Sequence, residues 1–226
     1  MIASQQTNSR LRALDGCLAG QEVWILADGL SARAFDMRTL DLSRTLCVNH
    51  SYLNVQGKPA FLFAGDHAFM NERKDKTPLS DCAHTVLVSP EVPVRDAPNV
   101  IRYEKRPFGL GQSFLDGLYG KKSIGITAMH AAILMGAALI NLIGFDYRVY
   151  TPEEAKEYFG VEHEVHASGD LAAHRNTPGH VKMKGDVTIY EDRLPFFAPF
   201  VNHKHLFVNH NKHSALRMFP FAQGET

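Results

Sequence analysis

The sequence predicts an open α/β fold in which a mostly parallel, Rossmann-like sheet is flanked by helices. Short apolar runs end repeatedly in small or polar residues, which is the rhythm of such a sheet. A helix, a glycine and a strand follow one another over residues 125–143, and a polar, histidine-rich segment covers residues 148–186. The 226 residues suit one domain, so we expect a single α/β domain over 1–226, with residues 1–20 as an N-terminal tail.

The first predicted strand is the apolar run at residues 23–27, which ends in Asp28 and Gly29. A continuous apolar run of this length is typical of a strand that is buried on both faces of a parallel sheet. A short helix over residues 32–40 is expected next, with Ser31 as its N-cap. The same pattern predicts further strands at residues 45–48, 60–64, 85–88 and 100–103.

The clearest unit begins at Gly125 and continues as a predicted helix over residues 126–135. Gly136 is suited to a left-handed C-cap of this helix. Three alanines and Met135 recur at helical spacing, so this face should lie close to a sheet. The strand at residues 139–143 then ends just before Gly144 and Asp146.

The segment 148–186 changes to a polar composition rich in His, Glu, Gly and Lys. We expect a helix near residues 152–158 and then an irregular excursion, which predicts a lid or an acceptor-binding segment. A helix over residues 189–200, interrupted by prolines, and a last strand at residues 206–208 complete the predicted fold.

Composition narrows the function classes. Lys plus Arg and Asp plus Glu number 24 each, which disfavours a non-specific nucleic-acid binder. Three widely spaced cysteines and a start without an apolar signal core predict a cytoplasmic protein. The apolar stretch 124–147 contains Thr127, His130 and Asn141, so it predicts a buried helix and strand rather than a membrane span. The sequence contains no heptad repeat, so a coiled-coil dimer is not predicted. A homo-oligomer of another kind remains possible.

Polar and small residues gather at the predicted carboxyl ends of the strands, where open α/β sheets bind ligands. The candidates for nucleotide or substrate binding are Asp28, Gly29, Ser31, Asn49, Asp66, Gly125, Thr127 and Asp146. Two helix N-termini, after Gly29 and at Gly125, would offer unpaired N–H groups to phosphate oxygens. The alternative is that the glycines only form turns and the polar residues only cap helices.

Three segments carry a resemblance to known families: VWILADGLSARAFD, LCVNHSYL and GITAMHAAILMGAALINLIGFDY. Together they resemble the MptE-like (DUF115) proteins and the bacterial sialyltransferases of glycosyltransferase family 42. The resemblance covers residues 22–70 and 120–150. It implies that Gly29 and Ser31 hold a nucleotide and that Asn49 contacts it. Ala27 and Leu30 depart from the glycine and proline of the family pattern.

The resemblance to the sialyltransferases implies a histidine general base in the mobile segment, and His180 matches it best by position, followed by His174. Tyr150 would support the leaving phosphate. The MptE-like group implies the alternative, a Mg²⁺-dependent diphosphokinase in which Asp28, Asp66 and Asp146 would place the metal. A non-catalytic nucleotide binder is the third possibility. The histidines show no compact zinc spacing, so no metal ligand is assigned.

Overall fold

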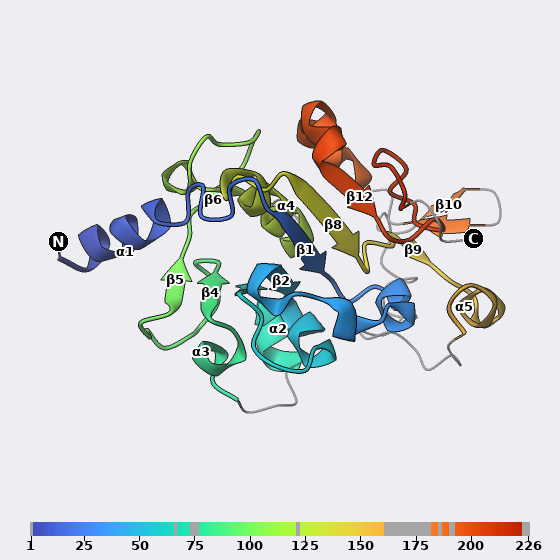
Figure 1. The fold of residues 1–226 in the computed structure, drawn as a ribbon, viewed down its shortest axis with the longest axis horizontal. Coiled ribbons are helices and arrows are strands. Elements are labelled where there is room, and N and C mark those ends of the chain that lie inside the picture. Colours follow the sequence, from blue (N-terminus) through green and yellow to red (C-terminus); the bar gives the residue numbers. More distant parts are fainter. Residues whose placement is uncertain are drawn as a thin grey trace.

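Seven parallel strands form the central sheet of the computed structural model, which describes residues 2–65, 67–72, 77–120, 123–160, 182–184, 187–189 and 193–222. The predicted α/β class is confirmed. Figure 1 shows these strands side by side in the order β12-β8-β1-β2-β3-β4-β5. Their bounds are β1 Glu22–Leu26, β2 Thr45–Val48, β3 Phe61–Ala64, β4 Thr85–Val88, β5 Val100–Arg102, β8 Leu139–Ile143 and β12 Phe207–Asn209.

The strands are mainly apolar because both faces of the sheet are buried. Successive side chains of a strand point to opposite faces, so each strand contributes to two cores. In β3, Phe61 and Phe63 enter one core, and Leu62 and Ala64 enter the other. The sheet therefore has two separate hydrophobic layers to cover.

One face is covered by helix α4 (Ile124–Leu134), which contacts β1, β2 and β3. The face predicted from the alanine spacing is buried completely, with Ala128, Ala131, Ala132 and Met135 all at 0% exposure. The small side chains let the helix approach the strands closely. Gly136 follows the helix with a φ of 81°, as its predicted role in the C-terminal turn requires.

Short helices cover the opposite face. They are the 3₁₀ helices η1 (Leu30–Ala34), η2 (Met37–Thr39), η3 (Leu42–Arg44) and η4 (Asn49–Asn54), with α2 (His67–Glu72) and α3 (Leu79–Cys82). Ala32, Tyr52 and Phe69 are among the residues that these elements contribute to the second core. The chain therefore places connections on both faces, as in a doubly wound sheet.

The helix expected over residues 32–40 with Ser31 as its N-cap is wrong. Two 3₁₀ helices occupy this stretch, and Gly29 stands at the N-cap of η1 without a side-chain bond. The Ser31 side chain lies inside η1 and bonds Asp146 instead. Asp36 accepts a hydrogen bond from the Arg38 backbone N–H, and such local bonds favour a turn over a continuous α-helix.

The N-terminal residues, expected as a tail, include helix α1 (Ile2–Arg12). Leu11, Leu14 and Leu18 are buried against the core on the α4 side. Arg10 donates to the carbonyl oxygens of Pro98 and Val100, beside the edge strand β5. In Figure 1 this helix lies at the β5 end of the molecule, so it covers an edge that would otherwise expose unpaired backbone groups.

The remaining elements lie after β5 in the chain. They are β6 (Lys105–Arg106), η5 (Phe114–Asp116), β7 (Leu118–Tyr119), β9 (Arg148–Val149), α5 (Pro152–Phe159), β10 (Lys182–Lys184), β11 (Val187–Ile189) and η6 (Leu194–Leu206). Strands β6 and β7 pair with each other, and β9, β10 and β11 form a small antiparallel sheet. The helix expected over residues 189–200 is wrong in its bounds and type, since Ile189 lies in β11 and η6 is a 3₁₀ helix.

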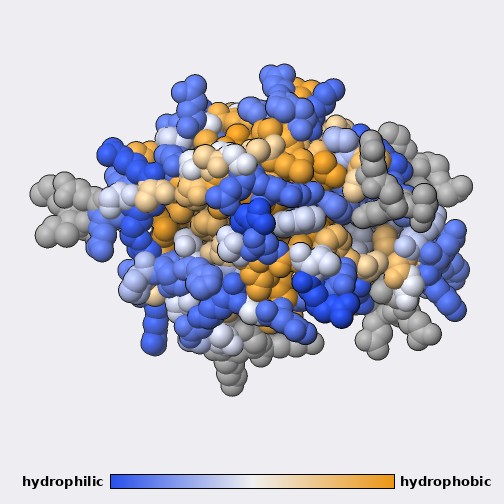
Figure 2. All heavy atoms as spheres, in the orientation of Figure 1, coloured by the Kyte–Doolittle hydropathy of each residue, from blue (hydrophilic) through white to orange (hydrophobic). Residues whose placement is uncertain are grey.

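Polar residues ring the face of the molecule drawn in Figure 2, and apolar residues gather in its upper middle. In the part of the chain that the structure describes, no helix has both the length and the apolar character to cross a bilayer. The apolar stretch at 124–147 is divided between α4 and β8, as the sequence predicts.

Candidate functional site

The carboxyl ends of the seven parallel strands form one edge of the sheet, and the candidate site lies there. The chain proceeds from β1 to β5 in one direction and then returns through α4 to β8, on the other side of β1. The reversal of strand order between β1 and β8 is a topological switch point, where open α/β sheets bind ligands.

The turn after β1 is held directly against the turn after β8. The Gly29 backbone N–H donates to the Gly144 carbonyl oxygen at 3.1 Å. A Cβ atom at Gly29 would lie 2.2 Å from that oxygen and 2.7 Å from Asp146 Oδ2. Glycine is therefore required here by the close approach of the two chain segments.

Asp146 links the same two turns through its carboxylate. The Ser31 backbone N–H donates to Oδ2 at 3.0 Å, the Ser31 hydroxyl donates to Oδ1, and Asn211 Nδ2 donates to Oδ1 at 2.7 Å. The carboxylate is buried, with the residue 5% exposed. Burial raises its pKa, and the donors from Ser31 and Asn211 oppose that rise. Asp146 and Ser31 thus hold the turns after β1 and β8 together at the switch point.

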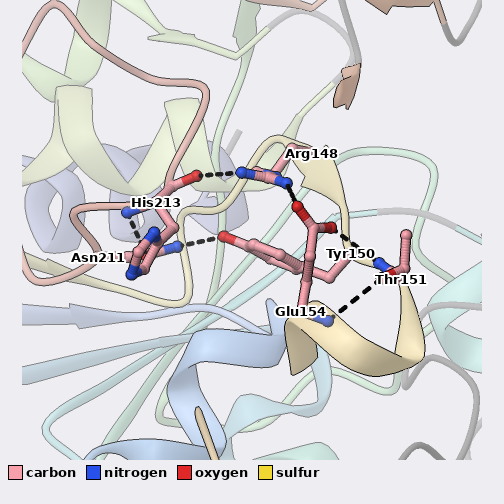
Figure 3. Close-up of polar contacts among 6 residues, drawn as sticks. All are labelled: Arg148, Tyr150, Thr151, Glu154, Asn211 and His213. Carbon is pink, nitrogen blue, oxygen red and sulfur yellow. Dashed lines mark hydrogen bonds and ion pairs between the residues drawn. The ribbon is translucent and has the colours of Figure 1, made fainter. Parts of the chain in front are cut away.

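Tyr150, in the segment after β8, bonds the same asparagine, Asn211, as Figure 3 shows. Asn211 Nδ2 also donates to the Tyr150 hydroxyl at 2.7 Å. The tyrosine is 5% exposed, and desolvation raises the pKa of its hydroxyl well above the usual range. The structure therefore places Tyr150 in the packed support behind Asp146.

Arg148 fastens helix α5 to the C-terminal segment, on the same side of the molecule (Figure 3). Its guanidinium donates to the His213 carbonyl oxygen at 3.3 Å and pairs with Glu154. Glu154 also accepts the Thr151 backbone N–H at 2.9 Å, which closes a capping box at the start of α5. The arrangement anchors the chain just before residue 161.

Asp28 differs from Asp146 because it is only partly buried at the end of β1. Desolvation raises the pKa of its carboxyl to about 7, and the hydrogen bond from the His50 backbone N–H opposes that rise. Among the described residues, no Lys or Arg contributes to this shift. A carboxyl group with a pKa near neutrality at a switch point is a candidate functional group.

Asn49 begins the turn after β2 in a left-handed conformation, with a φ of 50°. Its Oδ1 accepts the Gly65 backbone N–H at 3.1 Å, which ties the end of β2 to the end of β3. Gly65 in turn contacts α4, since a Cβ there would lie 2.8 Å from Ile124 Cβ. Asn49 thus stands beside the start of α4.

Helix α4 begins at this edge with an N-cap, Ser123, whose side chain makes no capping bond. The Ser123 hydroxyl instead shares a hydrogen bond of 2.8 Å with the Tyr147 hydroxyl. Tyr147 has a φ of 49°, and among the described residues only Asn49 and Tyr147 are non-glycine residues with positive φ. Because backbone strain of this kind gathers at functional sites, its presence at both turns supports a site here.

Gly125 and Thr127 occupy the first turn of α4 but are buried. A Cβ at Gly125 would lie 3.0 Å from Phe145 Cε1, and the Thr127 hydroxyl packs against Gly120. The Thr127 side chain and the space beside Gly125 are both occupied by contacts within the protein. Any ligand contact in this turn would therefore come from backbone N–H groups. These groups carry partial positive charge at a helix N-terminus.

Asp66 and His180 lie outside the described residues, and so does His174. Within the described part of the chain, no three His, Cys, Asp or Glu side chains gather as a metal site would need. Asp28 and Asp146 are the only members of the proposed Mg²⁺ set that the structure describes, and Asp146 already holds Ser31 and Asn211.

Sequence reasoning did not identify Asn211, Ser123 or Tyr147 as parts of this edge. Asn211 lies just beyond the Val-Asn-His repeat at residues 208–210, which matches residues 48–50 at the end of β2. This repeat was the available signal, because both copies stand at strand carboxyl ends.

Comparison of the chain with protein-family models, curated proteins and solved structures finds no match.

Proposed function

We propose that this protein is a nucleotide-sugar-dependent glycosyltransferase that binds its nucleotide at the carboxyl ends of the strands. The observation that carries the proposal is the meeting of strand ends with the first turn of α4. Gly65 and Tyr147 stand at two strand ends and contact the start of this helix, and Asn49, at a third strand end, bonds Gly65.

The start of α4 supports phosphate binding for an electrostatic reason. The first backbone N–H groups of a helix have no partner within the helix and carry partial positive charge. The Ser123 side chain does not cap them. A phosphate group of the nucleotide would accept hydrogen bonds from these groups.

The chemistry proposed for the transfer is displacement of the nucleotide phosphate by an acceptor hydroxyl, with His180 taking the hydroxyl proton. The network of Asp146, Asn211 and Tyr150 would act as a rigid support at this edge. A rigid support holds reacting groups in place at little entropic cost. Anchoring of α5 through Arg148 would position the chain that leads toward residue 180.

The first test is a thermal-shift panel of CMP, UDP, GDP and ATP and of CMP-, UDP- and GDP-sugars, with Mg²⁺ or with EDTA. Selective binding raises the apparent stability by mass action. Binding and transfer that survive EDTA support the glycosyltransferase. ATP binding that disappears with EDTA would indicate the diphosphokinase, and binding without turnover of any candidate would indicate a nucleotide-binding protein.

The second test uses Ser123→Asp. An aspartate at the N-cap would accept the first N–H groups of α4 and repel phosphate, so we expect nucleotide affinity to fall by roughly tenfold or more. Ser123→Ala is the matched control and should bind close to the wild-type level. The aspartate should leave the ligand-free protein at least as stable, because it caps the helix. Unchanged affinity in Ser123→Asp would place the phosphate elsewhere.

The third test addresses the base. His180→Ala should bind nucleotide normally and lose transfer activity by about 10²–10⁴-fold. Equal turnover in the variant and in wild type would remove His180 from the proposed chemistry.

A further inference from the structure

Asp28 is held in a fixed place by its neighbours in the chain. Gly29, the next residue, is locked against Gly144, and Ser31 is locked against Asp146. The His50 backbone N–H faces the Asp28 carboxylate from the end of β2 and lowers its pKa. The carboxyl group therefore stands between the ends of β1 and β2 in a position that ligand binding does not need to organise.

The Asp28 carboxylate has unused hydrogen-bonding capacity. An ionised carboxylate offers about four acceptor positions. Asp146 accepts hydrogen bonds from two groups of Ser31 and one of Asn211, and the Leu30 backbone N–H also faces it. For Asp28, the hydrogen-bond donor among the described residues is the His50 amide, and the residue remains partly exposed. It is therefore open to donors that a ligand brings.

The donors of a nucleotide are in its sugar and base, whereas its phosphates are acceptors at neutral pH. A phosphate beside Asp28 would meet a like charge, and no Lys or Arg in the described part of the chain contributes to the electrostatics of this carboxyl group. The first turn of α4 offers the opposite environment. The chain of contacts from His50 through Asn49 and Gly65 to Ile124 connects the two places along the strand ends.

The spacing fits one ligand. Neighbouring strands lie about 4.8 Å apart, so the ends of β1 and β3 are separated by about 10 Å. This distance is comparable to the reach of a nucleoside diphosphate from its sugar to its terminal phosphate. One molecule would thus contact Asp28 and the start of α4 together.

We propose that Asp28 accepts a hydrogen bond from a sugar hydroxyl of the bound nucleotide, which places the sugar over the ends of β1 and β2 and the phosphates over the start of α4. The proposal rests on the proposed nucleotide binding and adds the orientation of the ligand. Asp28 is then the residue that distinguishes ribonucleotides from analogues without sugar hydroxyls. Burial gives this carboxyl group a near-neutral pKa, and the His50 amide is its donor among the described residues. A ligand hydroxyl would add a second donor and so favour the ionised carboxylate.

The test compares the best binder among CMP, UDP, GDP and ATP with its 2′,3′-dideoxy analogue by isothermal titration calorimetry. Wild type should bind the ribonucleotide about tenfold more tightly or better, as a charged hydrogen bond predicts. Asp28→Ala should bind the two compounds equally, at the level that wild type shows for the analogue. Asp28→Asn keeps an acceptor oxygen without charge and should retain part of the preference.

The wild-type protein provides a second readout that needs no variant. Its preference for the ribonucleotide should increase as the pH rises from about 5.5 to about 8.5, because Asp28 ionises near 7. Among the described residues, the titratable groups near it are the Cys47 thiol, with a pKa raised to about 12, the buried Asp146 and His50, whose backbone N–H faces the carboxyl group. Phosphate ionisation is the same in both compounds and cancels in the ratio.

The outcomes separate the two proposals. Wild type that binds none of the four nucleotides overturns the nucleotide site and the orientation together. Tight binding of both compounds with no preference overturns only the orientation. Stronger binding by Asp28→Ala than by wild type would show that the carboxylate faces phosphate, which also contradicts the proposed orientation.

Discussion

Asp146 and Asp41 receive the same pair of hydrogen bonds from a serine in very different surroundings. The Ser31 backbone N–H donates to Asp146 at 3.0 Å, and the Ser43 backbone N–H donates to Asp41 at 3.0 Å. Each serine hydroxyl donates to the same carboxylate. Asp146 is 5% exposed, while the Asp41 side chain is 42% exposed. Asp41 also pairs with Arg44 at 2.7 Å, and Asp146 also accepts from Asn211, so the two residues compare a buried carboxylate network with an exposed one.

Asp146→Asn should lower the free energy of unfolding by about 2–4 kcal/mol, because one amide N–H₂ would face the buried donors of Ser31 or Asn211. Asp41→Asn should cost less than about 1 kcal/mol, since water can solvate its partners. Urea denaturation at pH 7 measures both. Equal losses in the two variants would contradict the assignment of Asp146 as the buried link between the turns.

Sequence reasoning brought Asp146 to the correct edge of the sheet but did not identify its partners. The rule that parallel strands end at one edge predicts which residues are near one another. It says nothing of which side chains pair, and Ser31 and Asn211 lie 115 and 65 residues away. The roles predicted for Ser31, Asp146 and Tyr150 as ligand contacts stay predictions, and in the structure all three bind protein groups.

At the scale of elements, the junction of β1 and β8 depends on the missing side chain of Gly29. Its backbone is ordinary, with a φ of −61°. The obstacle to a larger residue is therefore contact with the Gly144 carbonyl oxygen and the Asp146 carboxylate. Gly109 presents the opposite case, with a φ of 62° and no atom within 4 Å of the place that a Cβ would occupy.

Gly29→Ala should destabilise the protein by more than about 3 kcal/mol or prevent folding, because the two turns must separate. Gly109→Ala should cost only about 1–2 kcal/mol, the cost of a left-handed alanine. Thermal unfolding followed by circular dichroism compares the two variants. A Gly29→Ala protein as stable as Gly109→Ala would mean that the β1 and β8 turns are not packed against each other.

The strands were predictable from sequence because each is a short apolar run with polar ends, and β2, β4 and β8 have the predicted bounds. The helix type in the connections could not be predicted, because hydrogen bonds between side chains and nearby backbone groups determine it. Asp36 and Asp41 accept backbone N–H groups two residues later, which favours short 3₁₀ turns. Helix α1 was missed because its buried leucines at residues 11, 14 and 18 extend past its end into turns.

At the scale of the whole molecule, two titratable groups that folding desolvates give the free energy of unfolding opposite dependences on pH. Desolvation raises the pKa of Asp28 to about 7 and lowers the pKa of His130 to about 4. His130 lies inside α4, where its Nδ1 accepts the Tyr119 backbone N–H at 2.9 Å. Near it, Arg106 and His203 lower the pKa further, while the Gly111 carbonyl and Asp116 raise it.

The signs follow from proton binding in the folded and unfolded chains. Between about pH 4 and pH 7 the folded protein holds a proton on Asp28 that the unfolded chain has lost, so this group stabilises less as the pH rises. Between about pH 4 and pH 6.5 the unfolded chain protonates His130 and the folded protein does not, so this group stabilises less as the pH falls. In wild type the two slopes oppose each other.

Single variants should therefore reveal slopes that wild type hides. Asp28→Asn removes the Asp28 contribution, so relative to wild type its free energy of unfolding should increase more steeply with pH from about 4.5 to about 6.5, by at most about 1.4 kcal/mol per pH unit. His130→Gln keeps an acceptor for the Tyr119 N–H and removes the titration, so relative to wild type its stability should decrease with pH over the same interval. Urea denaturation at about pH 4.5, 5.5 and 6.5 measures all three proteins, and the double variant should be as flat as wild type. Parallel curves for the two single variants would contradict the opposition, because two groups with opposite proton uptake cannot leave the same slope when removed one at a time.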